Sequence, residues 1–187
     1  MTFIHFYCKS NEIFVFVCSG EPGIKVDIND QASSWDYFNL FIGEDVLEEM
    51  MRQTNLYAAQ YKEAAGDNIK PNNLLKDWKN ITIPELKVFI GLLFLMGVVK
   101  KPDVKSYWST NPLIETPFFG KTMARNRFEA ILMAFHLNDN NNNLPKDHPN
   151  YDKLFKVRPL ITRLQEKFAS TYVPKQNLAI DESMMPW

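Results

Sequence analysis

The sequence predicts a mainly α-helical protein. Two observations carry this prediction. Apolar residues recur every three or four positions in segments 44–65, 84–99, 123–136 and 159–172, and after the N-terminal region strand-like alternation occurs only in residues 178–183. With 187 residues, 45% hydrophobic and 23% charged, the chain can bury a core and lacks the composition of a disordered protein.

The first predicted helix begins near Glu44 and ends before Gly66, a residue suited to a helix C-cap. Its apolar positions share one face: Leu47, Met50, Met51, Thr54, Ala58, Tyr61 and Ala65. Acidic residues fill its first turn, where they match the positive end of the helix dipole. We therefore expect an amphipathic helix with a solvated acidic start.

The second predicted helix runs from about Pro84 to Val99. Thr82 and Glu85 have the spacing of a capping box, with a proline in the first turn. Apolar residues occupy nearly every side of this helix, which predicts a central position with neighbours all round. Its apolar run of about a dozen residues falls short of the roughly 20 needed to cross a bilayer, so we expect no membrane partner.

Two further helices complete the predicted helical part. The connection that contains residues 106–120 should be pinned by Tyr107, Trp108, Phe118 and Phe119, and residues 138–143 should form an Asn-rich loop. Pro159 is placed in the first turn of the last helix, which ends near Tyr172. The inward residues of that helix are expected to be Leu160, Ile161, Leu164 and Phe168.

Charge is distributed unevenly along the chain. The formal net charge of -1 excludes nucleic-acid binding by bulk positive charge. Up to residue 120 there are 11 basic and 15 acidic residues, a net of -4, and beyond it there are 10 and 7, a net of +3. A local basic face in the second half therefore stays possible.

Three basic residues, Lys121, Arg125 and Arg127, fall at the predicted start of the helix over 123–136. Cations at the positive end of a helix dipole cost a few tenths of a kcal/mol each, so an anion is expected beside them. That anion could be a phosphate group or carboxylates from the acidic first half, and the sequence leaves both interpretations open. A second basic segment, 152–172, carries Lys153, Lys156, Arg158, Arg163 and Lys167 against Asp152 and Glu166.

The two cysteines, Cys8 and Cys18, are too few for a disulfide framework or a four-cysteine zinc site. A reducing, intracellular setting fits this usage best. The apolar segment 1–20 is interrupted by Lys9 and Glu12 and lacks a basic start, so we expect neither a signal peptide nor a membrane span.

A series of short motifs, in this order, resembles the piggyBac transposase family and its transposase-derived relatives. The motifs are YFNLF, TNLYA around Asn55, W-x-x-x-T-x-x-E-L-K-x-F-I-G from Trp78 to Gly91, LMG, the YW at Tyr107, MARNRFEAI, FHLNDN, DKLFKVRPLI and AIDESMMPW. The resemblance covers roughly residues 20–187, and residues 1–19 do not share it.

The resemblance implies a domain organisation. It implies a helical dimerisation and DNA-binding domain over 20–173 and the start of a truncated RNase H-like catalytic domain over 174–187, after an unmatched segment 1–19. Full-length relatives cut and paste DNA at TTAA sites with Mg²⁺ held by three aspartates, and Asp181 matches the first of these as a catalytic residue and metal ligand. The resemblance also implies a nuclear location.

The six basic residues Lys121, Arg125, Arg127, Lys156, Arg158 and Arg163 are the candidates for phosphate contacts to DNA resembling a transposon end. The alternative that they brace helix ends against acidic neighbours stays open. One aspartate, Asp181, is too little to hold two metal ions, so we expect no transposase activity from this chain alone. Two further hypotheses are a remnant that forms homodimers or pairs with a full-length relative, and a fragment of an active transposase.

Overall fold

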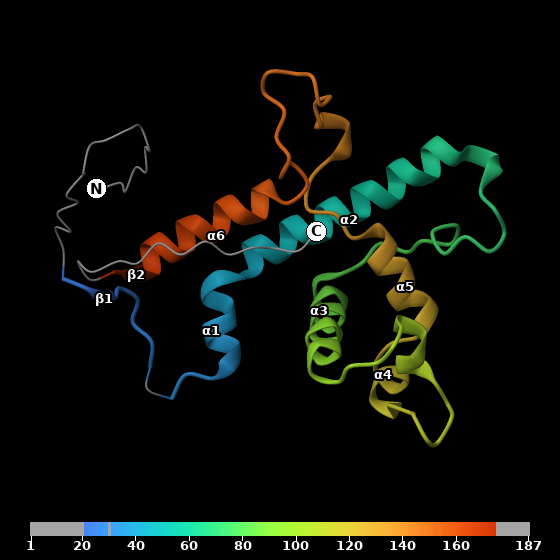
Figure 1. Cartoon of the computed structure of the whole chain (residues 1–187), viewed down its shortest axis with the longest axis horizontal. Helices are drawn as coiled ribbons and strands as arrows, with labels where there is room; N and C mark the ends of the chain where they lie inside the picture. Colours follow the sequence, from blue (N-terminus) through green and yellow to red (C-terminus); the bar gives the residue numbers. More distant parts are fainter. Residues whose placement is uncertain (1–20, 30, 175–187) are drawn as a thin grey trace. The chain divides into compact units, whose positions relative to one another are not determined.

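A computed structural model of the chain describes residues 21–29 and 31–174, without the side chain of residue 67. As predicted, it is mainly helical (Figure 1). The elements in chain order are β1 (Gly23–Ile24), α1 (Ser34–Phe41), α2 (Glu44–Ala65), η1 (Gly66–Asn68), α3 (Ile83–Val98), η2 (Val104–Trp108), α4 (Pro117–Thr122), α5 (Arg125–Ala134), η3 (Asn140–Asn142), α6 (Arg158–Thr171) and β2 (Tyr172–Val173), where η marks a 3₁₀ helix. Among these described residues, no helix is both long and apolar enough to cross a membrane.

The chain divides into two compact units, 42–163 and a smaller one formed by the residues on either side. In the smaller unit β1 pairs antiparallel with β2, with Gly23 opposite Val173. The rings of Phe41 and Phe168 lie 5.0 Å apart. Phe168 nevertheless stays 55% exposed, which corrects the prediction that it faces inward. The paired phenylalanine ring covers only part of its surface.

Helix α2 has the predicted bounds. Its buried residues include Leu47, Met50 and Ala58 from the predicted face, and Gly66 closes the helix with a left-handed φ of 49°. The side chain of Asn55 bonds both backbone groups of Ile81, accepting from its N–H at 2.8 Å and donating to its carbonyl at 3.1 Å. This pair of hydrogen bonds fixes the chain to α2 two residues before α3 begins.

Helix α3 begins as predicted, but the described residues do not surround it. The Thr82 hydroxyl caps it by accepting from the Glu85 N–H, although the Glu85 carboxylate bonds a different partner. Only Leu86, Phe89 and Leu92 are fully buried, while Val98 is 81% exposed. Residues three positions apart lie on one side of a helix, so these three form one buried stripe. Within the described residues, α2, α5 and nearby segments are too few to cover the other sides of the helix.

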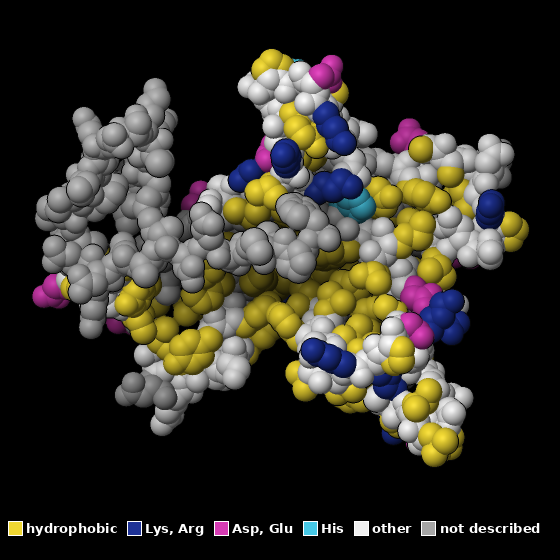
Figure 2. Space-filling model, viewed as in Figure 1, with side chains coloured by type: hydrophobic (Ala, Val, Ile, Leu, Met, Phe, Trp, Pro, Cys, Tyr) yellow, Lys and Arg dark blue, Asp and Glu magenta, His cyan; other side chains and the backbone are white. Residues whose placement is uncertain are grey.

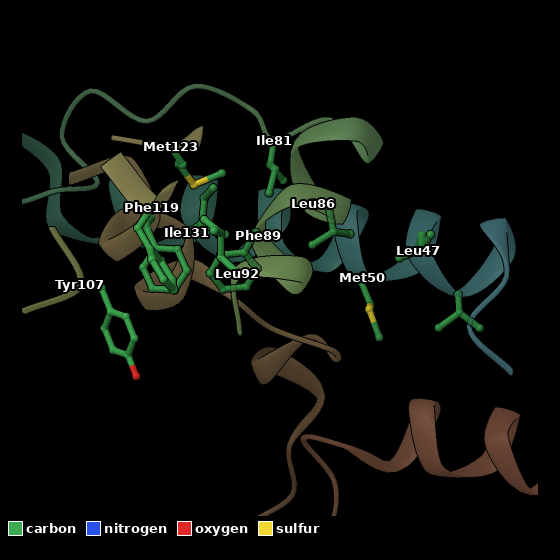
Figure 3. Packing of buried hydrophobic residues seen from close by; sticks show 12 residues of the cluster. Leu47, Met50, Ile81, Leu86, Phe89, Leu92, Tyr107, Phe119, Met123 and Ile131 are labelled. Atoms are coloured by element: carbon green, nitrogen blue, oxygen red, sulfur yellow. The ribbon is translucent and has the colours of Figure 1, made fainter. Parts of the chain in front are cut away.

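The stripe of α3 is part of the main hydrophobic core. The ring of Phe89 packs 5.0 Å from that of Phe128 on α5 and 5.7 Å from that of Phe135. Figure 3 shows Phe89, Phe119 and Ile131 converging, whereas Tyr107 lies at the edge of the cluster with its hydroxyl turned away. That hydroxyl donates to the Val99 carbonyl at 2.7 Å and so ties the end of α3 to η2.

The predicted connection between helices contains η2 and α4. Tyr107 and Phe119 are buried anchors as expected, and the Trp108 indole donates to the Met123 carbonyl at 2.7 Å. Phe118 is not an anchor, since it is 59% exposed. Successive helical residues point about 100° apart, so turning Phe119 inward turns Phe118 outward.

The helix predicted over 123–136 is shorter than expected. It spans Arg125–Ala134, and Met123 and Ala124 adopt extended conformations that separate it from α4. Lys121 therefore belongs to the last turn of α4, where a cation suits the negative end of the dipole. The prediction that it opens the following helix was wrong, whereas Arg125 and Arg127 do lie in the first turn of α5.

Residues 138–143 form the predicted loop around the single turn η3, which the Asp139 side chain caps. Helix α6 begins at Arg158 with Pro159 in its first turn, as predicted. The strand expected over 178–183 lies outside the described residues, as do Cys8 and Cys18.

The one-sided burial of α3 can be tested by two truncations. We expect Phe89→Ala to lower the free energy of unfolding by about 3 to 5 kcal/mol, because it leaves a cavity between α3 and α5. The exposed Val98→Ala should change it by less than about 0.5 kcal/mol. Urea unfolding followed by circular dichroism measures both. Equal destabilisation by the two variants would contradict the burial described above.

Candidate nucleic-acid interface

The six basic candidates are distributed over three helices and one loop of the described chain. Arg125 and Arg127 open α5, Lys121 ends α4, and Lys156 lies in the loop before α6. Arg158 begins α6, and Arg163 lies farther along the same helix. Their neighbours divide them into a paired group and an exposed group.

Arg127 is held by two partners from other segments. Its guanidinium forms a two-pronged ion pair with the Glu85 carboxylate, with N–O distances of 2.6 and 2.7 Å. It also lies over the Trp78 ring, 4.7 Å from the centroid. Such bidentate pairs are the strongest form of charge-assisted hydrogen bond, and the ring adds a cation–π contribution. The anion expected beside this helix start is therefore, for Arg127, a carboxylate from the first half of the chain.

The two candidates on α6 are also paired. Arg158 forms a bidentate pair with Asp152 at 2.6 and 2.7 Å, which with the Leu154 N–H lowers the pKa of that carboxyl to about 2. The pair also raises the pKa of Arg158. The Arg163 guanidinium donates to the Asp45 carboxylate at 3.0 Å and so ties α6 to the start of α2. Both arginines are thereby positioned by acidic neighbours.

The remaining three candidates are exposed and weakly engaged. Arg125 is 48% exposed at its side chain and approaches only Glu129, with an N–O distance of 3.9 Å. Within the described residues, Lys121 and Lys156 form neither an ion pair nor a side-chain hydrogen bond. These three cations can accept a new anionic partner without first breaking a close one.

Arg125 lines an open groove between η2 and α5. Lys105 and the hydroxyl-bearing residues Ser106, Ser109 and Thr110 line the same groove. Hydroxyl groups and cations are the donors that usually contact phosphate oxygens of DNA. Asp103 and Glu129 line it as well, so the groove is mixed in charge and not a uniformly basic channel.

His136 is a potential contact residue that the charge pattern did not single out. Its ring stacks on Tyr57 of α2, with centroids 3.6 Å apart and an interplanar angle of 13°. Partial burial and the nearby Lys156 ammonium lower its pKa. The FHLNDN motif contains this histidine, but only the tertiary structure brings Tyr57 and Lys156 to it.

Asp181, the candidate catalytic residue and metal ligand, lies outside the described residues. Within residues 21–29 and 31–174, no group of three or more His, Cys, Asp or Glu side chains could hold a metal ion. The described helices thus offer no set of ligands for the Mg²⁺ that the resemblance implies.

The bracing role of Arg127 predicts a stability effect. We expect Arg127→Gln to lower the free energy of unfolding by about 1 to 2 kcal/mol, since it leaves the half-buried Glu85 without its partner. Thermal unfolding at neutral pH measures the loss. Arg125→Gln is the matched control in the same helical turn and should cost less than about 0.5 kcal/mol. An Arg127 variant as stable as the control would show that the pair does not brace the fold.

Comparison with known proteins identifies relatives along most of the chain. The family model described as Transposase IS4 matches residues 33–187. The human PiggyBac transposable element-derived protein 5 is 29% identical over 154 residues, which cover 82% of this chain and 27% of that protein. The human PiggyBac transposable element-derived protein 3 is 30% identical over 153 residues, covering 81% and 22% respectively. No solved structure matches the chain.

The human PiggyBac transposable element-derived protein 2 is also similar, with 29% identity over 166 residues. The aligned part covers 89% of this chain and 25% of that protein, so the chain spans about a quarter of the length of these relatives. The similarity confirms the family resemblance of the motifs from YFNLF to AIDESMMPW. Because the family model covers most of the chain, helices and motifs included, the chain belongs to the Transposase IS4 family and is a piggyBac-like, transposase-derived protein.

Proposed function

We propose that the helical part of this chain binds duplex DNA through its phosphate backbone. The observation that carries the proposal is the exposure of Arg125, Lys121 and Lys156, which make no close ion pair within the described residues. Membership of a transposase family supports DNA as the polyanion, and a nuclear location forms part of the same proposal.

The expected binding is weak and sensitive to salt. Phosphate contacts gain free energy largely by releasing counterions from DNA, and each neutralised phosphate adds about 0.9 to the salt slope. Three exposed cations, with acidic residues nearby, supply few such contacts. They also carry no base information by themselves, so the proposed binding is largely independent of sequence.

Strand cutting is not part of the proposed activity of these 187 residues. Asp181 is proposed as the first catalytic aspartate and as a Mg²⁺ ligand, by resemblance alone. A two-metal site needs several carboxylates to neutralise and position the ions. Catalysis would therefore require further carboxylates in addition to Asp181, and the proposed role of the helices is binding.

A second candidate function is self-association, or pairing with a longer relative. Apolar side chains remain exposed on neighbouring parts of the larger unit, including Val98 on α3 and Phe118 on α4. Leu95, Val99, Pro117, Phe118 and Phe119 line an open, mostly apolar groove there. Contiguous exposed apolar surface often marks a protein interface.

DNA binding can be tested by titrating the full chain into a fluorescent duplex at several salt concentrations. We expect the double variant Lys121→Gln, Arg125→Gln to lower the affinity and to make the salt slope shallower by about 2, one for each lost phosphate contact.

The matched control is Arg127→Gln, compared at a temperature where it is still folded. Its affinity should stay near that of the unaltered chain, because the Glu85 pair already occupies that guanidinium. Affinity that is absent, or that does not change with salt, would refute the proposal.

Self-association has its own test. We expect Phe118→Glu to shift the chain toward the monomer in sedimentation equilibrium, because it places a charge in the apolar groove. The equivalent change at an exposed apolar loop residue, Leu144→Glu, should leave the distribution unaltered. A chain that is monomeric without any substitution would exclude self-association.

A further inference from the structure

His136 occupies a fixed position beside a basic loop. Its ring is held flat against Tyr57 of α2, and its Nδ1 lies 3.1 Å from the Ala134 carbonyl. Because that contact requires a proton on Nδ1, the neutral ring presents Nε2 as an acceptor. Within the described residues, Nε2 has no hydrogen-bond partner.

The loop that carries Lys156 is tied to the same place. The Asn138 side chain donates to the Phe155 carbonyl at 2.9 Å, which anchors the residue before Lys156 next to the end of α5. On the visible face of the described residues, Figure 2 shows Lys and Arg side chains scattered among hydrophobic ones, without one continuous basic patch. Lys156 is exposed and unpaired within the described part of the chain.

Within residues 21–29 and 31–174, no carboxylate forms an ion pair with His136 or Lys156. Asp139 is close along the chain, but its carboxylate accepts from the Gln60 amide of α2 at 3.0 Å and interacts with Arg52. Tyr57 faces His136 with its ring, and Lys156 is the charged group that acts on it. A proton added to Nε2 would therefore meet a like charge in the free protein.

We propose that His136 and Lys156 together form a contact site for one DNA phosphate, which His136 binds in its protonated form. The phosphate would accept from Nε2–H and from the Lys156 ammonium, and its charge would offset the repulsion between the two cations. This inference rests on the proposed function, since it names a further contact for the same ligand. It adds that DNA binding takes up a proton.

The sign of the pH dependence follows from this arrangement. Burial and Lys156 lower the pKa of His136 and so favour its neutral form in the free protein. A bound phosphate favours the imidazolium and raises that pKa, so DNA affinity should rise as the pH falls from about 8 to about 5.5. By linkage, each unit of increase in the pKa corresponds to about a tenfold gain in affinity.

Two independent measurements on the full chain test the proposal. NMR titration of the His136 ring, with and without a DNA duplex, should show the pKa rise on binding. The ratio of affinities at the two pH values should match that rise. His136→Phe, which keeps a ring on Tyr57, should abolish the pH dependence but keep the salt dependence due to Lys121 and Arg125. His148→Gln, which removes a histidine from an exposed loop, should change neither.

A second variant separates a contact role from a structural one. Lys156→Gln should raise the His136 pKa in the free protein, because it removes the repulsion, and should lower DNA affinity at both pH values. Salt-sensitive binding that does not change with pH, or an unaltered His136 pKa in the complex, overturns the inference and leaves the proposed function standing. No binding to DNA at either pH overturns both.

Discussion

The ion pair between Arg127 and Glu85 is the contact on which the arrangement of the larger unit depends. It joins the first turn of α5 to the first turn of α3, and Trp78 from the preceding connection lies against the same guanidinium. The neighbouring residue, Phe128, then meets Phe89 in the core. A bidentate pair that is partly shielded from water sets both distance and angle, so it fixes how the two helices meet.

Several residues in the motifs that resemble the piggyBac family act in the same way. Asn55 binds the backbone of residue 81, Trp108 that of Met123, and Asn138 that of Phe155. Each side chain satisfies a polar backbone group in a segment distant along the chain. These motif residues therefore connect segments of the helical fold that are distant along the chain. Arg125, which is proposed to contact DNA, is exposed and lies two residues after Met123.

The larger unit is too small to bury all of its apolar side chains. Helix α3 carries apolar residues on all sides, yet among the described residues a unit of this size fully buries only the stripe with Leu86, Phe89 and Leu92. The surface left over is continuous with α4 through Val99 and Phe118. Burying that surface in a partner would gain free energy that the isolated unit does not obtain.

The sequence by itself determined the longer helices, because periodicity, capping residues and prolines act locally: α2, α3 and α6 were predicted within a residue or two, and the motifs identified the family. The short helices α1 and α4 were not predicted. The sequence could not decide that Phe118 is exposed, nor whether phosphate or carboxylate would meet each cation at the start of α5. Those outcomes depend on segments distant along the chain, such as Glu85 beside Arg127 and Tyr57 beside His136. Only the tertiary structure decided them, since burial and pairing energies arise when such segments come together.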